Sequence, residues 1–160
     1  MPAIGDPFLG GVLAYILQPG DPGYDANVPH GLIAAPSDQS TGVIWGCYGN
    51  LVTGADGSAI GTGRQNTEDI VIGCFYPTPL AADVCDILSL GGYDDWYLPS
   101  IDELLMLRNN KTAIGGFSNA NYWSSTQQGT LYAQFADFSG SAAGGISKNS
   151  SFRVRAIRDF

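Results

Sequence analysis

The chain has 160 residues, and its net charge of −8 argues against nucleic-acid binding, which needs a basic surface. Only 14% of the residues are charged, while 22 glycines and nine prolines favour short strands, tight turns and long ordered loops over a helical bundle. The length fits one domain covering 1–160, no apolar run approaches the ~20 residues of a membrane span, and the first residues lack the basic region of a signal peptide.

The first third of the chain predicts two strands followed by loops. Residues 10–17 ("GGVLAYIL") and 31–36 ("GLIAAP") are short apolar runs bounded by turn residues. Residues 37–49 and 51–63 are rich in Gly, Ser, Thr and Asp, which predicts ordered loops.

The middle of the chain predicts three helices. The first follows Thr67, which is an N-cap candidate with acidic residues in the first turn. The second covers 80–92 and is expected to end at its glycine pair. Its apolar face consists of Leu80, Val84, Ile87 and Leu88. The third begins at Ser100, which forms a capping box with Glu103, and ends near residue 110.

Beyond residue 117 the pattern changes to the period of two that is typical of strands. Residues 122–126, 132–138 and 152–157 alternate and are rich in aromatic and β-branched side chains. The facing of 132–138 is irregular, because Phe138 falls on the same face as Gln134, and this indicates a bulge or twist. The predicted fold class is α+β, with helices in the middle and strands from both chain ends close together.

Three segments carry a resemblance to a known family: "GGYDDWYLPSIDELLML" (91–107), "NYWSST" (121–126) and "KNSSFRVRAIRDF" (148–160). They resemble the C-terminal domain of collagen-like bacterial adhesins, the Lcl-type domain. The resemblance implies a C-type-lectin-like fold and a non-catalytic binding module. It also implies a homotrimer, and its adhesin members bind sulfated polysaccharides. This chain differs from them in having no basic residue between 127 and 147.

The large side chains in these segments have two interpretations. Trp96, Tyr97, Leu98 and Trp123 are expected to anchor the core of a loop-rich domain, and ligand stacking is the alternative. Asp94 and Asp95 form an acidic pair that could hold calcium, although turn and cap functions are commoner for such pairs. The resemblance otherwise implies no cofactor.

Charge is unevenly distributed. Residues 1–103 carry thirteen acidic residues and one base, whereas residues 104–160 carry two acidic and six basic residues. This polarity could steer an anionic ligand. The simpler interpretation is that the C-terminal arginines, Arg153, Arg155 and Arg158, pair internally with N-terminal acids through their planar guanidinium groups.

Cys47, Cys74 and Cys85 are the three cysteines. They fit one disulfide with a spare thiol or three buried thiols, and the sequence does not distinguish the two. None of them forms a CxxC pair, so a structural zinc site is not expected.

An enzyme is not expected. The hydroxyls of Ser124, Ser125 and Thr126 have no evident base, because His30 is the sole histidine and its position favours a structural role. The formylglycine-generating enzymes are similar in topology to lectin-like folds, but they depend on C-terminal cysteines. This chain has no cysteine after Cys85.

The expected binding surface lies in the loops 119–134 and 141–151, because their Tyr, Gln, Ser and Asn side chains suit a recognition surface on a rigid scaffold. An ordinary polar hairpin is the alternative. The candidate ligand-binding residues are Asn119, Asn121, Gln127, Gln128, Thr130, Tyr132, Gln134, Asp137, Ser147 and Asn149.

The expected function is extracellular recognition of a cell-surface glycan or protein receptor. The apparent lack of a secretion signal favours the tip of a phage tail fibre or baseplate, located on the virion tail. The alternatives are a bacterial surface adhesin domain and a structural assembly protein without a ligand of its own.

Overall fold

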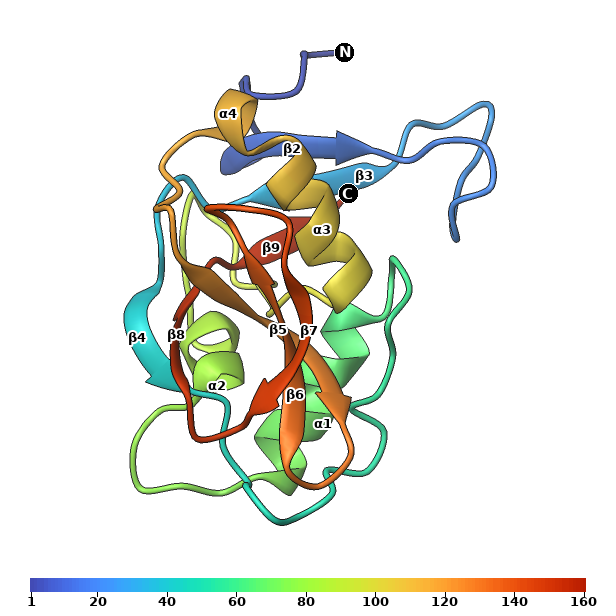
Figure 1. Cartoon of the computed structure of the whole chain (residues 1–160). Coiled ribbons are helices and arrows are strands. Elements are labelled where there is room, and N and C mark those ends of the chain that lie inside the picture. The colour runs from blue at the N-terminus through green and yellow to red at the C-terminus, as the bar shows by residue number, and fades with distance from the viewer.

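The computed structural model describes all 160 residues and has a mixed α+β architecture, as the sequence predicted (Figure 1). One sheet has the order β1-β2-β3-β9 and contains β1 (Pro7–Phe8), β2 (Gly11–Ile16), β3 (Gly31–Ala34) and β9 (Ile157–Asp159). The other has the order β4-β8-β5-β6-β7 and contains β4 (Ser40–Ile44), β8 (Ser151–Val154), β5 (Asn121–Gln128), β6 (Tyr132–Asp137) and β7 (Ala143–Ser147). The helices are α1 (Gly63–Gly73), α2 (Ala81–Asp86), α3 (Ile101–Asn109) and α4 (Lys111–Ile114).

The first sheet brings the two ends of the chain together, which confirms the expected proximity of the terminal strands. β9 pairs antiparallel with β3, so that Ile33 lies opposite Arg158. The rings of Phe8 and Phe160 meet edge to face with centroids 5.2 Å apart. The chain therefore crosses between the sheets twice, once from β3 to β4 and once from β8 to β9.

The helices pack against the two sheets, and α1 and α2 contact strands of the five-stranded sheet. α3 contacts β2 in one sheet and β5 and β6 in the other, and so bridges the two sheets (Figure 1). Its predicted capping box is confirmed: the Ser100 hydroxyl accepts from the Glu103 N–H at 3.3 Å, and the Glu103 carboxylate accepts from the Ser100 N–H at 2.7 Å. None of the helices combines the length and apolar character needed to cross a membrane.

The predicted start of the first helix is wrong. α1 begins at Gly63, and Thr67 lies inside it, 1% exposed. The Thr67 hydroxyl donates to the Gly63 carbonyl at 2.8 Å and accepts from the Leu98 N–H at 3.0 Å. Thr67 therefore holds the helix against the 96–100 segment instead of capping it.

The second helix is shorter than predicted. α2 ends at Asp86, and Ile87, which was expected on its apolar face, is 73% exposed. The glycine pair does not terminate the helix: Leu90 and Tyr93 form a β-bridge around it. Gly91 is required by close packing, because a Cβ there would lie 2.3 Å from the Gly10 carbonyl oxygen.

Three strands were missed and one predicted strand is split. β1, β4 and β7 fall in segments rich in Gly, Pro and small polar residues, where β-propensity is low. Tertiary pairing forms them nonetheless, and β7 pairs with β6 along all five of its residues. The strand expected at 152–157 divides into β8 and β9, because the chain changes sheets at Arg155 and Ala156.

The irregularity expected around β6 is present in its pairing with β5. The register shift lies in the partner strand, between Trp123 and Gln127 of β5. Ala133 and Ala136 are both fully buried because the sheet has a hydrophobic cluster on each face.

The four expected anchors, Trp96, Tyr97, Leu98 and Trp123, are all at most 2% exposed, which confirms their place in the core. A fifth anchor was missed. Trp45 lies just after β4 in a segment expected to be a loop, is 1% exposed, and donates from Nε1 to the Ser124 carbonyl at 2.9 Å.

The internal pairing expected for the C-terminal arginines is confirmed. Arg153 and Arg155 both contact the Asp38 carboxylate, at 3.0 and 2.7 Å. Arg158 donates to both oxygens of Asp95, at 2.6 and 2.8 Å, and these hydrogen bonds lower the pKa of that carboxyl group. Three of the six basic residues in 104–160 are therefore paired with acidic residues from the first part of the chain.

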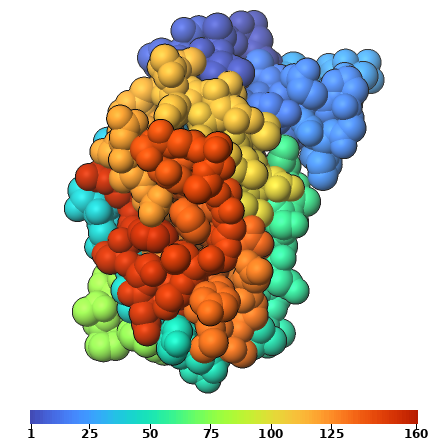
Figure 2. Space-filling view, viewed as in Figure 1, coloured from blue at the N-terminus to red at the C-terminus, as the bar shows by residue number.

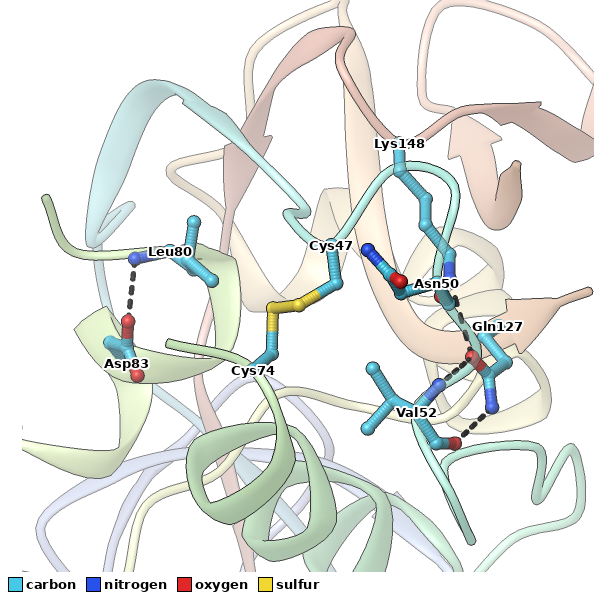
Figure 3. The surroundings of a disulfide bond; sticks show 8 residues. All are labelled: Cys47, Asn50, Val52, Cys74, Leu80, Asp83, Gln127 and Lys148. Carbon is cyan, nitrogen blue, oxygen red and sulfur yellow. Dashed lines mark hydrogen bonds between the residues drawn. A yellow bond between two sulfur atoms is a disulfide. The ribbon is translucent and has the colours of Figure 1, made fainter. Parts of the chain in front are cut away.

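The cysteines follow the first of the two alternatives. Cys47 and Cys74 form a disulfide across 27 residues, which joins the segment after β4 to the end of α1 (Figure 3). Cys85 is a free, buried thiol, and burial raises its pKa well above the usual value.

Candidate ligand-binding surface

The structure separates the predicted ligand-binding residues into two groups on the five-stranded sheet. Asn119, Asn121 and Asp137 lie where β5 begins and β6 ends, and they line a groove. The second group lies near the β5–β6 turn and the β7–β8 turn, at the end of the molecule farthest from the chain termini (Figure 1). It contains Gln128, Thr130, Tyr132, Ser147 and Asn149. Gln134 lies between the groups on β6 and is half-buried.

The groove has a volume of about 500 Å³ and opens on the β4, β5 and β8 side of the sheet. Its lining is mainly polar and consists of Thr41, Asn119, Ala120, Asn121, Asp137, Ser139, Ser151, Phe152 and Arg153. In Figure 2 the orange and red C-terminal segments form the middle of the visible face, below the blue N-terminal segments, with cyan residues along its left edge.

Hydrogen bonds fix one wall of the groove, which is formed by the start of β5 and the end of β6. Asn121 pairs with Asp137 across the β5–β6 ladder, and the Phe138 N–H donates to the Ala120 carbonyl at 2.9 Å. The Asp137 carboxylate accepts from the N–H and hydroxyl of Ser139, at 2.8 and 2.6 Å. These hydrogen bonds lower the pKa of Asp137, so it is a carboxylate at neutral pH.

The opposite wall contributes an aromatic ring and a guanidinium group. Phe152 stacks against Trp123 and Phe135, with centroids 4.7 and 5.4 Å apart, which holds its ring in place. Arg153 is tied to Asp38 and its side chain is 28% exposed. By contrast, the amides of Asn119 and Asn121 make no hydrogen bond within the chain, so they are free to contact a ligand.

The second group lies beside several exposed apolar side chains in the chain, and this set is here called the aromatic end. Gly129 adopts a positive φ of 72° in the three-residue turn between β5 and β6. The Gly49 N–H donates to the Thr130 carbonyl at 2.9 Å, and this joins the turn to the disulfide-linked loop. The aromatic end consists of Tyr48, Leu51, Ile72, Phe75, Tyr76, Leu131 and Tyr132, all more than a third exposed.

Gln127 is not available to a ligand at the surface. It is 5% exposed, and its Oε1 accepts from the Val52 N–H at 3.0 Å and from Lys148 Nζ at 3.3 Å (Figure 3). Its Nε2 donates back to the Val52 carbonyl. Gln127 therefore holds the 50–52 loop against β5.

Lys148 is fully buried beside Gln127, with Nζ 3.0 Å from the Asn50 carbonyl and 4.7 Å from the centre of the Trp45 ring. Burial penalises the cation and lowers the pKa of Lys148 from 10.5 to about 8. At pH values between the folded pKa of about 8 and the unfolded pKa of 10.5, Lys148 binds more protons in the unfolded chain than in the folded one. The Lys148 contribution to stability therefore increases as pH rises.

Lys148→Met should isolate this contribution, because methionine keeps the apolar stem without the charge. We expect the unfolding free energy of the variant, relative to wild type, to fall by about 1–2 kcal/mol between pH 7.5 and 9.5. Urea unfolding of both proteins across this range measures the difference. A difference that is constant with pH would show that Lys148 does not titrate there.

The hydroxyls after Trp123 serve the fold. Ser124 donates to the Gln134 carbonyl at 2.7 Å, Ser125 accepts from Asn66 Nδ2 at 3.2 Å, and Thr126 donates to the Gly57 carbonyl at 2.8 Å. All three residues are at most 1% exposed, so no substrate can reach these hydroxyls. The structure thus removes them as candidate nucleophiles.

The calcium site considered for Asp94 and Asp95 stays a prediction. Both oxygens of Asp95 already accept from Arg158, so a cation would have to compete with that ion pair. No group of three or more His, Cys, Asp or Glu side chains is arranged to hold a metal ion.

Several groove residues escaped the sequence-based prediction. Thr41 belongs to the unpredicted strand β4, and Phe152 and Arg153 belong to β8 just beyond the predicted binding loop 141–151. The alternation of Phe152 and Arg153 was a usable signal for a surface position. When one face of a strand packs on the core, the other face can reach solvent. The pairing of β8 between β4 and β5 could not be deduced from this alternation.

The comparison with protein families identifies the domain. The model of the Lcl C-terminal domain matches residues 35–158. The chain belongs to the Lcl C-terminal domain family. This confirms the resemblance seen in the sequence, and the match extends from the end of β3 to β9.

A solved structure shows the same fold more distantly. The Lcl chain is similar to a fimbrial protein from Bacteroides ovatus, with a TM-score of 0.58 and 17% identity. The similarity covers 98% of this chain but only 44% of the fimbrial protein, so the Lcl chain spans less than half of that protein's length. At this identity the likeness concerns the fold alone. No curated protein matches the chain.

Proposed function

We propose that this Lcl domain is a non-enzymatic, adhesin-type recognition domain that acts at a surface and binds a glycan in the groove between β4, β5 and β8. The observation that carries the proposal is the set of free polar groups there. The amides of Asn119 and Asn121 face an open groove and have no partner in the chain.

The groove chemistry suits a neutral sugar better than a polyanion. Amides, hydroxyls and the Asp137 carboxylate offer donors and acceptors for sugar hydroxyls, and the Phe152 ring offers an apolar surface. The single base, Arg153, is already paired with Asp38, and the chain carries a net charge of −8. A sulfated polysaccharide would meet little uncompensated positive charge.

The family and the fimbrial neighbour favour a surface adhesin domain over the tip of a phage tail fibre. The location we propose is therefore an extracellular, bacterial-surface one. A C-type-lectin-like fold and a homotrimer remain part of the proposal, and the joined chain ends support the first because both termini contribute to one sheet.

The double variant Asn119→Ala/Asn121→Ala should weaken glycan binding at least about tenfold, because it removes two side chains able to make direct hydrogen bonds. A glycan array identifies a bound sugar, and calorimetry with that sugar gives the affinities. Gln128→Ala/Tyr132→Ala is the matched control at the other end of the same sheet, and it should bind like wild type.

The aromatic end favours a second candidate function, recognition of a protein receptor. Exposed aromatic side chains in a patch commonly mark protein interaction sites. If the control loses binding to intact cells while the groove variant keeps it, this second candidate replaces the glycan proposal. If the folded wild-type protein binds neither glycans nor cells, a structural assembly function becomes the better account.

A further inference from the structure

A second, smaller cleft lies on the other sheet, away from the groove. Its volume is about 250 Å³, and it lies beneath the segment between β2 and β3, which projects from the body in Figures 1 and 2. Its lining includes His30, Ile60, Tyr97, Asp159 and Phe160.

Tyr97 contributes an unpartnered polar group to this cleft. The residue is only 2% exposed, yet its hydroxyl makes no hydrogen bond within the chain. Every fully buried polar side-chain atom in the structure has a partner, so the Tyr97 hydroxyl keeps some contact with solvent. Burial raises the pKa of Tyr97 well above its usual value, and the phenol therefore stays neutral and can both donate and accept.

The other polar groups of the cleft are acceptors. His30 Nδ1 lies 3.0 Å from the Phe160 carbonyl oxygen, which can only accept. In the neutral ring Nδ1 therefore carries the proton, and Nε2 is left as an acceptor. The Asp159 carboxylate also lines the cleft and is bound on one oxygen by Arg64. Arg64 in turn lies over the Tyr97 ring, 4.8 Å from its centre.

The walls are apolar. Leu17, Pro22, Leu32, Ile60 and Phe160 surround a space that holds one ring-sized group and no extended chain. A ligand for this cleft must therefore have apolar faces and must bring its own hydrogen-bond donors. The carboxylate of Asp159 and that of Glu103, which accepts from the Gly61 N–H at 2.8 Å, disfavour an anion.

We propose that this cleft is a second binding site, which takes a single small uncharged ring bearing hydroxyl groups. The Tyr97 hydroxyl would accept from or donate to a ring hydroxyl, while Ile60 and Phe160 cover the ring faces. The site is independent of the glycan groove, because the two share no residue and lie on different sheets.

Tyr97→Phe tests the proposal, because it removes only an atom that makes no hydrogen bond in the free protein. Backbone amide shifts of the labelled domain are followed as phenol, and separately a methyl glucoside, is added at millimolar concentrations. We expect at least one probe to shift resonances of 17–32, 60–61 and 97, and Tyr97→Phe to bind it about tenfold more weakly. The unfolding free energy should not change measurably.

Ile60→Trp provides a second test by filling the cleft from its rim, and it should abolish the shifts. Asn119→Ala/Asn121→Ala should leave them unchanged, which separates this site from the groove. The proposal is overturned if neither probe shifts these resonances, or if Tyr97→Phe binds as tightly as wild type.

Discussion

Replacement of Asp38 by alanine should lower the free energy of unfolding by about 3–5 kcal/mol, because it leaves buried cationic and hydroxyl groups without their acceptor. Asp38 accepts from Arg155 at 2.7 Å, from Arg153 at 3.0 Å and from the Tyr122 hydroxyl at 2.8 Å. The Arg155 side chain is fully buried, and its charge would then lie in the protein interior uncompensated.

The position of this pair in the fold explains the size of the effect. Asp38 lies where the chain passes from β3 to β4, and Arg155 lies where it returns from β8 to β9. Arg155 also donates to the carbonyls of Ala35, Gly115 and Gly116. The Asp38–Arg155 ion pair thus joins three segments: the β3–β4 connection, the β8–β9 connection and the loop after α4. It therefore helps to fix the position of one sheet relative to the other.

Asp159→Ala is the matched control, since Asp159 is also an aspartate paired with an arginine. Its side chain is 58% exposed, and such pairs contribute less than about 1 kcal/mol. Urea unfolding of the two variants compares buried and exposed pairing directly. Asp38→Asn should fall between them, because the amide keeps the shape and one acceptor. Equal losses of unfolding free energy for Asp38→Ala and Asp159→Ala would contradict the proposed importance of the Asp38–Arg155 pair at the sheet crossings.

The sequence was most informative where one local signal agreed with the tertiary contacts. The capping box at Ser100 and Glu103 predicted α3, because the local preference and the buried face of the helix coincide there. The aromatic, alternating run 132–138 predicted β6, although both faces of that strand carry buried residues. The aromatic anchors were predicted for the same reason: a Trp in a Gly-rich domain has few places to lie except the core.

The predictions failed where pairing overrides propensity. β7, with the sequence AGGIS, has no local reason to extend, and it forms because β6 supplies five consecutive pairing positions. Thr67 fits an N-cap in sequence but is used inside α1 to bind Leu98, a residue 31 positions away. Contacts of this length are invisible in a local window.

The candidate site shows the same limit. Composition identified Asn119, Asn121 and Asp137, yet it could not separate them from Gln127, whose side chain is buried, because both kinds of position are polar. The groove exists because β8 inserts between β4 and β5. The pairing of β8 with β4 joins residues more than a hundred positions apart, such as Val43 and Phe152, which a single sequence does not reveal.

Loss of the Cys47–Cys74 disulfide should be the second large effect. A cross-link that closes a loop of this length stabilises a protein by about 3–4 kcal/mol, mainly by restricting the unfolded chain. We expect Cys47→Ala/Cys74→Ala to lose that much unfolding free energy. Cys85→Ala is the control, because it removes the buried free thiol and leaves the cross-link intact, and it should lose less.

The backbone at Cys47 allows a sharper version of this experiment. Its φ of +51° lies in the left-handed region, where a β-carbon costs about 1–2 kcal/mol and glycine costs none. Once the cross-link is gone, Cys47→Gly/Cys74→Ala should therefore be about 1 kcal/mol more stable than Cys47→Ala/Cys74→Ala. Recovery of that size would show that residue 47 keeps its left-handed conformation without the cross-link. If the glycine variant is the less stable of the two, residue 47 leaves the left-handed conformation once the cross-link is gone. The conformation of this loop, which contributes Tyr48 and Leu51 to the aromatic end, then depends on the disulfide.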